Sequence, residues 1–306
     1  MELLYLLEGI RTPFWDTVLG AITLFGEETL FILLAVILFW CVDKRGGYYM
    51  MATGFIGVVA NQFLKLWFRI PRPWVRDPNF TIVESAREAA SGYSFPSGHT
   101  QAVMSSLGVP AVITKKPWLR IACIALIALT AFSRMYLGVH TPADVGVSLI
   151  VGAVLLAAIY PVFYAKGNAV KRIYILFTCM IGLAVLFLLF TELYPFPADI
   201  DAENYASGIK NAYTMLGVSL ALLISLHIDR KYIRFKTQAP LWAQLIKVVG
   251  GLALLMLIRI LLKQPLLTVF GGHHAADAIR YFLMMLFAGC IWPLTFKLYQ
   301  DKGKKS

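Results

Sequence analysis

Charged residues are scarce in this sequence, and acidic residues are the scarcest. Of its 306 residues, 17 are acidic and 28 are Lys or Arg, whereas hydrophobic residues make up 59% and the mean hydropathy is +0.70. No soluble globular domain needs that much apolar surface. The composition therefore excludes the soluble class. We expect no nucleic-acid partner, because the net charge of +11 follows the membrane topology described below.

Cysteine is rarer still. The four cysteines all lie inside apolar segments and share no metal-like spacing: Cys41, Cys123, Cys179 and Cys290. We expect them to be packing residues, and the sequence predicts no metal site.

A secretory signal is also lacking. The N-terminal stretch MELLYLLEGIRTPFWD has neither the basic start nor the small-residue cleavage site of such a signal. It predicts an amphipathic helix that lies in the membrane interface, with Phe14 and Trp15 at the level of the lipid headgroups.

Long apolar runs are abundant instead. Several reach the roughly 20 residues that cross a bilayer core of about 30 Å, whereas a membrane β-barrel would show short alternating segments. The sequence therefore predicts an all-α, polytopic membrane helical bundle with about nine transmembrane helices and the N-terminal interfacial helix. The predicted spans are 24–42, 48–68, 98–114, 119–137, 142–165, 171–193, 208–228, 241–263 and 275–298.

The basic residues indicate which ends of these spans face the cytoplasm. Connections after the first, third, fifth and seventh spans, together with the C-terminal tail, are rich in Lys and Arg, and only Asp43, Asp229 and Asp301 among the acidic residues fall there. The positive-inside rule makes this face cytoplasmic. We expect a bacterial inner-membrane protein with a cytoplasmic C-terminus.

Three polar clusters meet on the opposite, extracytoplasmic face. Lys65 and Arg72 end the second span, the sequence PSGH begins the third, and the stretch SRMYLGVHTPAD joins the fourth to the fifth. Charged groups at membrane depth are costly and usually functional. No such cluster follows Lys166, so we divide the chain into a catalytic core, residues 1–166, and accessory C-terminal helices, residues 167–306.

The cations predict a phosphate site. Lys65, Arg72 and Arg134 together need an anion with several oxygens, and Arg matches phosphate geometry. Because PSGH begins a helix, the backbone N–H groups from Ser97 to His99 are expected to point at the same anion, and Gly98 allows close approach. Such a cradle has no requirement for a divalent metal.

Two histidines suit phosphoryl transfer. His140 lies four residues before Asp144, so the carboxylate can hold one ring nitrogen and leave the other free to attack phosphorus. His99 is the candidate general acid for the leaving oxygen.

Structural interpretations of the same residues stay open. Thr141, Pro142 and Asp144 also fit a helix-capping box, and Ser97 fits a plain N-cap. Lys65 and Arg72 also fit snorkelling interfacial residues. The loop from Trp74 to Tyr93 suits a substrate lid or a connector, and Arg259 and Asp277 suit an ion pair in the last spans.

The motifs KLWFRIPRP, PSGH and SRMYLGVHTPAD resemble the three signature motifs of the type 2 phosphatidic acid phosphatase superfamily at every specified position. The resemblance implies metal-independent hydrolysis without a cofactor, through a phosphohistidine intermediate. His140 would be the nucleophile, Asp144 its orienting partner and His99 the acid. The phosphate would be bound by Lys65, Arg72, Ser97, Gly98 and Arg134. The nine-span plan is also similar to the glucose-6-phosphatase and sphingoid-phosphate phosphatase branches.

We therefore expect a membrane phosphohydrolase whose partners are the bilayer and a lipid phosphate or diphosphate, such as undecaprenyl diphosphate or phosphatidate. Alternatives are a phosphatase for a soluble sugar phosphate such as glucose 6-phosphate, a vanadium haloperoxidase and a non-enzymatic lipid or phosphate transporter. We predict no oligomeric state.

Overall fold

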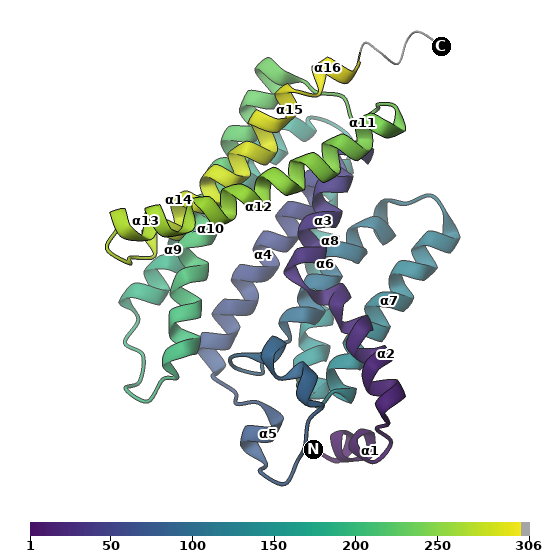
Figure 1. Cartoon of the computed structure of the whole chain (residues 1–306), viewed down its shortest axis with the longest axis vertical. Coiled ribbons are helices and arrows are strands. Elements are labelled where there is room, and N and C mark those ends of the chain that lie inside the picture. The colour runs from purple at the N-terminus through teal and green to yellow at the C-terminus, as the bar shows by residue number, and fades with distance from the viewer. Residues whose placement is uncertain (301–306) are drawn as a thin grey trace. The chain divides into compact units, whose positions relative to one another are not determined.

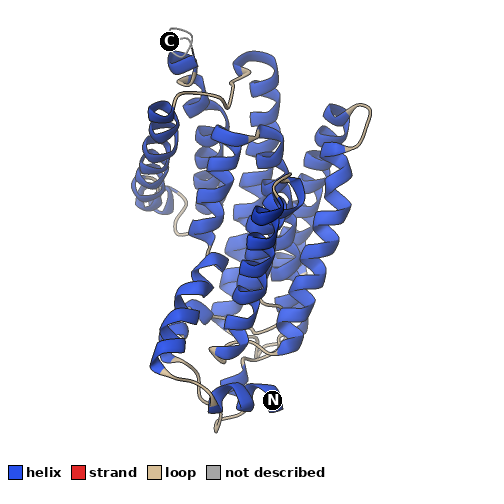
Figure 2. Ribbon diagram, turned by 90° about the vertical axis from the view of Figure 1, so that its right-hand side faces the viewer, coloured by secondary structure: helices blue, strands red, loops and turns tan. Residues whose placement is uncertain are grey.

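Helices account for all the regular structure between residues 1 and 300, the residues that the computed structural model describes (Figures 1 and 2). The all-α prediction is confirmed. The tail 301–306, including Asp301, lies outside the described residues. The α-helices are α1 (Glu2–Gly9), α2 (Pro13–Thr23), α3 (Glu28–Ile37), α4 (Lys44–Phe68), α5 (Pro73–Arg76), α6 (Gly98–Ile113), α7 (Pro117–Tyr136), α8 (Pro142–Tyr164), α9 (Ala169–Leu193), α10 (Ala202–Ile228), α11 (Leu241–Leu245), α12 (Gly251–Leu261), α13 (Lys263–Val269), α14 (Ala275–Leu286), α15 (Trp292–Leu294) and α16 (Lys297–Gln300).

Short 3₁₀ and π segments extend or join several of these helices. They are η1 (Leu24–Gly26), η2 (Leu38–Val42), η3 (Glu84–Ala86), η4 (Glu88–Ala90), η5 (Asp229–Ile233), η6 (Ile246–Gly250) and η7 (Phe287–Ile291).

Six helical spans within residues 1–300 are long and apolar enough to cross a membrane, so the chain is an integral membrane protein. They are Pro117–Tyr136, Pro142–Tyr164, Ala169–Leu193, Ala202–Ile233, Leu241–Val269 and Ala275–Leu294. A seventh arises if Pro13–Gly26 and Glu28–Val42, which meet at a bend of 53°, cross as one span.

The count is lower than nine because α4 and α6 do not meet the same criteria. Polar residues such as Asn61, Gln62 and Lys65 lower the hydropathy of α4, although it has 25 residues. Helix α6 has 16 residues, fewer than a bilayer core requires. Most of its residues are buried, including Gln101 and Ser105, so neighbouring helices and not lipid surround it.

The N-terminal segment forms two helices. Leu4 and Leu7 of α1 are buried, and Leu4 packs with Phe80 and Ile82, so α1 covers part of the loop that follows α5. Phe14 and Trp15, which we expected in the interfacial helix, instead begin α2 and are exposed. Pro13 at the first helical position separates the two helices.

The chain packs into two compact units, each described separately. The first contains Met1–Ile32, Thr53–Pro161 and Pro197–Gly208, and the second contains Leu33–Ala52, Val162–Phe196 and the chain from Ile209 onward. The functional division after Lys166 stays a prediction.

Close packing of α6 against α8 organises the first unit. A Cβ added at Gly108 of α6 would lie 2.5 Å from the side chain of Leu156, and one at Gly152 of α8 would lie 2.6 Å from Met104. The contact with Cβ of Met104 requires glycine at position 152, whereas at Gly108 the close atom is the movable end of the Leu156 side chain. The contact brings the first turns of α6 and α8 together, where the candidate site lies.

The second unit contains the polar residues of the last spans. Asp277 accepts a hydrogen bond from Nη2 of Arg280 at 2.5 Å and lies 3.3 Å from Nδ1 of His274. The expected pair of Arg259 with Asp277 is thus replaced by a pair one helical turn apart, because residues three apart share a helix face.

Candidate active site

The eight predicted site residues gather in the first unit, where five helices begin or end. Lys65 lies in the last turn of α4 and Arg72 just before α5, and Arg134 lies in the last turn of α7. Ser97, Gly98 and His99 open α6, while His140 and Asp144 flank the start of α8. Alternating helix directions put these ends on one side, as the sequence predicted.

Asp144 holds both a helix cap and the catalytic candidate His140. Its Oδ2 accepts from the backbone N–H of Thr141 at 2.7 Å and from the hydroxyl of Ser94 at 2.5 Å, and Nδ1 of His140 lies 3.5 Å away. Its own N–H donates to Oγ1 of Thr141 at 3.3 Å. The capping box and the histidine contact therefore coexist in one buried carboxylate.

Arg72 fixes the tautomer of His140. Nη1 of Arg72 lies 2.9 Å from Nε2 of His140, and a guanidinium can only donate, so Nε2 must accept. The proton of a neutral imidazole is then on Nδ1, the nitrogen that faces Asp144. This leaves the lone pair of Nε2 among the cations.

A tight turn presents His140 to the cluster. The N–H groups of Val139 and His140 donate to the carbonyl of Arg134 at 3.1 and 3.2 Å. Gly138 has φ +81°, and a Cβ there would lie 2.6 Å from Nη2 of Arg11. Nε of Arg11 in turn donates to the carbonyl of Tyr136 at 2.9 Å, so the N-terminal segment braces this turn.

Backbone carbonyls of the loop after α5 orient two of the cations. Arg72 donates to the carbonyls of Ser91 and Gly92, both at 2.8 Å. Lys65 donates to the carbonyl of Tyr93. Arg72 also reaches the carbonyl of Val139 at 2.9 Å. The last residues of the loop from Trp74 to Tyr93 therefore hold the cations in place. The sequence had suggested only a substrate lid or a connector for this loop.

Arg134 has hydrogen-bonding capacity that the described residues do not use. Its side chain is 0% exposed, and Nη1 donates to the hydroxyl of Thr23 at 2.7 Å. Nε and Nη2 are buried without a hydrogen-bond partner within residues 1–300. Buried guanidinium donors are rarely left unsatisfied unless a ligand completes them.

The start of α6 differs in part from the prediction. Ser97 is the N-cap, but its N–H donates to the carbonyl of Asp144 at 3.1 Å and is not directed at an anion. The N–H groups of Gly98 and His99 have no helical carbonyl to bond, as in every first turn. A Cβ at Gly98 would meet only Asn61, at 3.9 Å, so protein neighbours do not require glycine there.

Glu27 contacts the second histidine. Its Oε1 lies 2.7 Å from Nε2 of His99, and a Cβ at Gly26 would lie 2.7 Å from Cβ of His99. The bend between η1 and α3 thus delivers a carboxylate to His99. Glu27 lies 72 residues earlier in the chain and outside the three motifs, so sequence spacing gave no signal of it.

Burial and neighbouring charges shift the pKa values of His140 and Arg72, which lie outside the membrane spans. Burial, and after it the charges of Arg72, Arg134 and Lys65, hold the pKa of His140 well below its usual 6.5. Burial lowers the pKa of Arg72 to about 10, which keeps it cationic at neutral pH. A neutral imidazole therefore faces permanent cations. No group of three or more His, Cys, Asp or Glu within the described chain is placed to hold a metal ion.

The fold and the site define a polytopic helical membrane protein with a buried histidine beside a cluster of cations. Comparison with family models gives two matches, the PAP2 superfamily over residues 46–168 and the PAP2 superfamily phosphatase transmembrane extension over residues 213–303. The chain belongs to the PAP2 superfamily, which confirms the resemblance of the three motifs.

Several curated proteins are similar to parts of the chain. A probable sphingosine-1-phosphate phosphatase of Dictyostelium discoideum is 29% identical over 59% of this chain and 47% of its own length. The undecaprenyl-diphosphatase BcrC of Bacillus subtilis is 34% identical over 40% of this chain and 62% of its own length. The lipid A 4'-phosphatase of Bacteroides thetaiotaomicron is 26% identical over 49% of this chain and 71% of its own length. The chain thus spans about half of the first relative's length. No solved structure matches the chain significantly.

Proposed function

We propose that this chain is a metal-independent phosphohydrolase that removes phosphate from a lipid phosphate or diphosphate. The orientation of His140 carries the proposal. Its Nδ1 faces Asp144 and its Nε2 faces Arg72, which is the arrangement of a neutral nucleophile beside a phosphate-binding cation.

In the first step, Nε2 of His140 attacks the phosphorus and the bond from phosphorus to the lipid oxygen breaks. The proton on Nδ1 stays between His140 and Asp144, so the carboxylate stabilises the positive charge that the ring gains. Arg72 transfers its hydrogen bond from Nε2 to a phosphate oxygen when the substrate binds.

His99 serves the leaving oxygen and then the water. Protonated His99 gives its proton to the departing lipid oxygen, and the neutral ring then takes a proton from water. The resulting hydroxide attacks the phosphohistidine, the P–N bond breaks, and phosphate leaves with His140 restored. Burial lowers the pKa of His99, and Glu27, at 2.7 Å from the ring, opposes this shift by favouring the protonated form that the first step needs.

The cations stabilise the charge of the transferring group. The unpartnered Nε and Nη2 of Arg134 match two phosphate oxygens, and Lys65, Arg72 and the N–H groups of Gly98 and His99 complete the cradle. Ser97 contributes by capping α6 and holding Asp144 through backbone contacts.

A lipid substrate is favoured by the relatives and by the membrane setting. The names of the three relatives specify sphingosine 1-phosphate, undecaprenyl diphosphate and the 4'-phosphate of lipid A, all of them lipid phosphates. The match of residues 213–303 to a transmembrane extension supports an accessory role for the C-terminal helices.

We further propose that the site faces the extracytoplasmic side of a bacterial inner membrane, which the distribution of Lys and Arg supports. Green fluorescent protein fused after Ser306 tests the orientation in a bacterial host. Fluorescence of the fusion is expected with a cytoplasmic C-terminus, and its absence at full expression contradicts the proposal.

Phosphate release by the purified full chain in detergent with a chelator tests the reaction. The substrates are undecaprenyl diphosphate, phosphatidate, a sphingoid phosphate and glucose 6-phosphate. Release is expected from at least one of the lipids and should vanish in His140→Ala but persist in the matched control His273→Ala. Release from glucose 6-phosphate alone would favour the sugar phosphatase, and phosphate binding without release would favour a transporter.

A further inference from the structure

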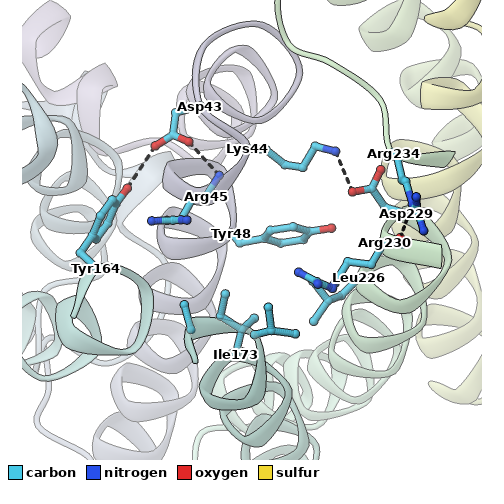
Figure 3. A pocket seen from close by; sticks show the side chains of 12 residues that line it. Asp43, Lys44, Arg45, Tyr48, Tyr164, Ile173, Leu226, Asp229, Arg230 and Arg234 are labelled. Carbon is cyan, nitrogen blue, oxygen red and sulfur yellow. Dashed lines mark hydrogen bonds and ion pairs between the residues drawn. The ribbon is translucent and has the colours of Figure 1, made fainter. Parts of the chain in front are cut away.

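A cavity separate from the candidate active site lies within the second unit. It has a volume of about 680 Å³, within the range of small-molecule sites. Its walls come from the first turns of α4 and α9, the last residues of α8, and the end of α10 with η5 (Figure 3). None of the eight candidate site residues lines it.

Cations outnumber carboxylates around this cavity by four to two: Lys44, Arg45, Arg230 and Arg234 against Asp43 and Asp229. Both carboxylates already have partners. Asp229 pairs with Lys44 at 2.7 Å, and Asp43 accepts from the hydroxyl of Tyr164 at 3.1 Å and from the N–H of Arg45 at 3.0 Å.

The lining of the cavity therefore keeps a net charge of +2. Within the described chain, Arg45, Arg230 and Arg234 form no ion pair with a carboxylate. Arg234 uses its Nε to hold the carbonyl of Arg230 at 2.9 Å, and Arg45 lies over the ring of Tyr164. All three line the same cavity, which distinguishes them from basic residues that merely flank a span.

A buried hydroxyl in the wall gives an independent indication of a ligand. Tyr48 lines the cavity and is 4% exposed, and its hydroxyl has no hydrogen-bond partner within residues 1–300. Its ring is fixed edge-on against Phe39 and Phe177. In Figure 3 the hydroxyl points toward the side where Lys44, Asp229 and Arg230 lie. A buried hydroxyl held this way is normally satisfied by a partner.

The helix directions add to the positive field. Lys44 is the first residue of the 25-residue helix α4, and Ala169 is the first of the 25-residue helix α9. Both helices therefore turn their N-terminal, positive ends toward the cavity. Asn168 caps α9 by accepting from the N–H of Lys171 at 3.0 Å.

We propose that this cavity binds a phosphate group, presented by the headgroup of an anionic phospholipid or free in solution. The guanidinium groups of Arg45, Arg230 and Arg234 would bind the phosphate oxygens, and the Tyr48 hydroxyl would donate to one of them. The apolar side chains of Ile173 and Leu226 in the same wall suit the first carbons of a lipid. This site is independent of the catalytic one.

Binding to the full chain in detergent tests the site with two probes, dioctanoyl phosphatidylglycerol and inorganic phosphate. Isothermal titration is performed on His140→Ala protein, in which neither probe is turned over. Tyr48→Phe and Arg230→Gln are each introduced separately into this His140→Ala protein. Lys231→Gln is the matched control, because it removes one positive charge from the same π turn but does not line the cavity.

Tyr48→Phe and Arg230→Gln should each weaken one probe by about fivefold or more, as the loss of one charge-assisted hydrogen bond predicts. Lys231→Gln should change affinity by less than about twofold. If the two variants lose affinity for phosphatidylglycerol alone, the ligand is a lipid headgroup. If they lose affinity for inorganic phosphate alone, the ligand is a soluble anion. Equal effects of all three variants, or none, overturn the proposal. Unchanged gel-filtration profiles and melting temperatures show that the variants fold.

Discussion

Nη1 of Arg72 donates to Nε2 of His140 across 2.9 Å, so the proposed phosphate-binding cation and the proposed nucleophile are in direct contact. Three backbone carbonyls, of Ser91, Gly92 and Val139, hold the guanidinium in this place. The contact keeps the imidazole neutral and its Nε2 lone pair directed at the position that a phosphate must occupy.

The pH dependence of kcat/KM follows from this contact. Because burial and the surrounding cations lower the pKa of His140, it stays neutral and reactive well below pH 6.5. We expect kcat/KM to fall on the acid side only below pH 6.5. The fall should occur at the same pH for two substrates whose phosphate groups have different pKa values, because it then reports on the enzyme. A common fall at or above pH 6.5 contradicts this.

The same shift affects stability. Unfolded His140 takes up its proton near its ordinary pKa of 6.5, whereas folded His140 does so only at lower pH. Acid below about pH 6.5 should therefore favour unfolding more strongly in wild type than in His140→Gln, as melting temperatures will show.

Asp144→Asn separates the capping role from the orienting role. Asn keeps the shape of the cap but lacks the charge that stabilises the attacking imidazole, so kcat should fall by about 10²–10⁴-fold with little loss of stability. Thr141→Val is the matched control. It removes the reciprocal cap bond and should lower stability by about 1 kcal/mol while kcat changes less than about tenfold. The opposite pattern would make Asp144 only a cap.

Arg134→Lys tests the unpartnered guanidinium. Lysine keeps the charge but cannot bind two phosphate oxygens with Nε and Nη2, so kcat/KM should fall by about 10²-fold. Arg69→Lys is the matched control, because the Arg69 side chain donates to the carbonyl of Leu66 and lies outside the proposed site, and it should leave kcat/KM within about twofold. Inhibition by vanadate provides a second readout and should weaken in Arg134→Lys alone.

His99→Ala tests the general acid through the leaving group. Loss of a general acid should lower turnover of an alkyl lipid phosphate by about 10²–10⁴-fold but spare p-nitrophenyl phosphate, whose leaving oxygen needs no proton. Glu27→Gln should give the same pattern more weakly, because its carboxylate contacts Nε2 of His99. Equal losses on both substrates would remove His99 and Glu27 from this role.

Gly138→Ala tests the turn that presents His140. Its φ of +81° and the 2.6 Å approach of Arg11 make a Cβ unfavourable, so we expect a loss of stability of about 1–2 kcal/mol and reduced activity. Gly146→Ala is the matched control in α8, where a Cβ meets nothing within 4 Å, and it should be neutral or stabilising. Melting temperatures and phosphate release distinguish the two.

Much of the site was predictable because its residues lie at helix ends. Alternating spans must bring those ends to one side, and the four-residue spacing of His140 and Asp144 fits one helical turn. The contacts of Glu27 and Ser94 were not predictable, since they depend on a bend and a loop that no periodicity encodes. The direction of the Ser97 N–H was predicted wrongly, because the tight packing of α6 on α8 gives it the carbonyl of Asp144.

The number of spans was harder to predict than their positions. A helix enclosed by others needs no apolar surface for lipid, so α4 and α6 carry polar residues or fall short of bilayer length. Criteria of length and hydropathy alone therefore do not count such helices among the spans.

Trapping the phosphoenzyme tests the central claim most directly. Wild-type protein is mixed with a lipid substrate, quenched in alkali, where phosphohistidine survives, and digested for mass spectrometry. We predict a phosphoryl group on the peptide that contains His140, absent in His140→Ala. Steady turnover with no phosphoryl group on that peptide would contradict the assignment of His140 as the nucleophile.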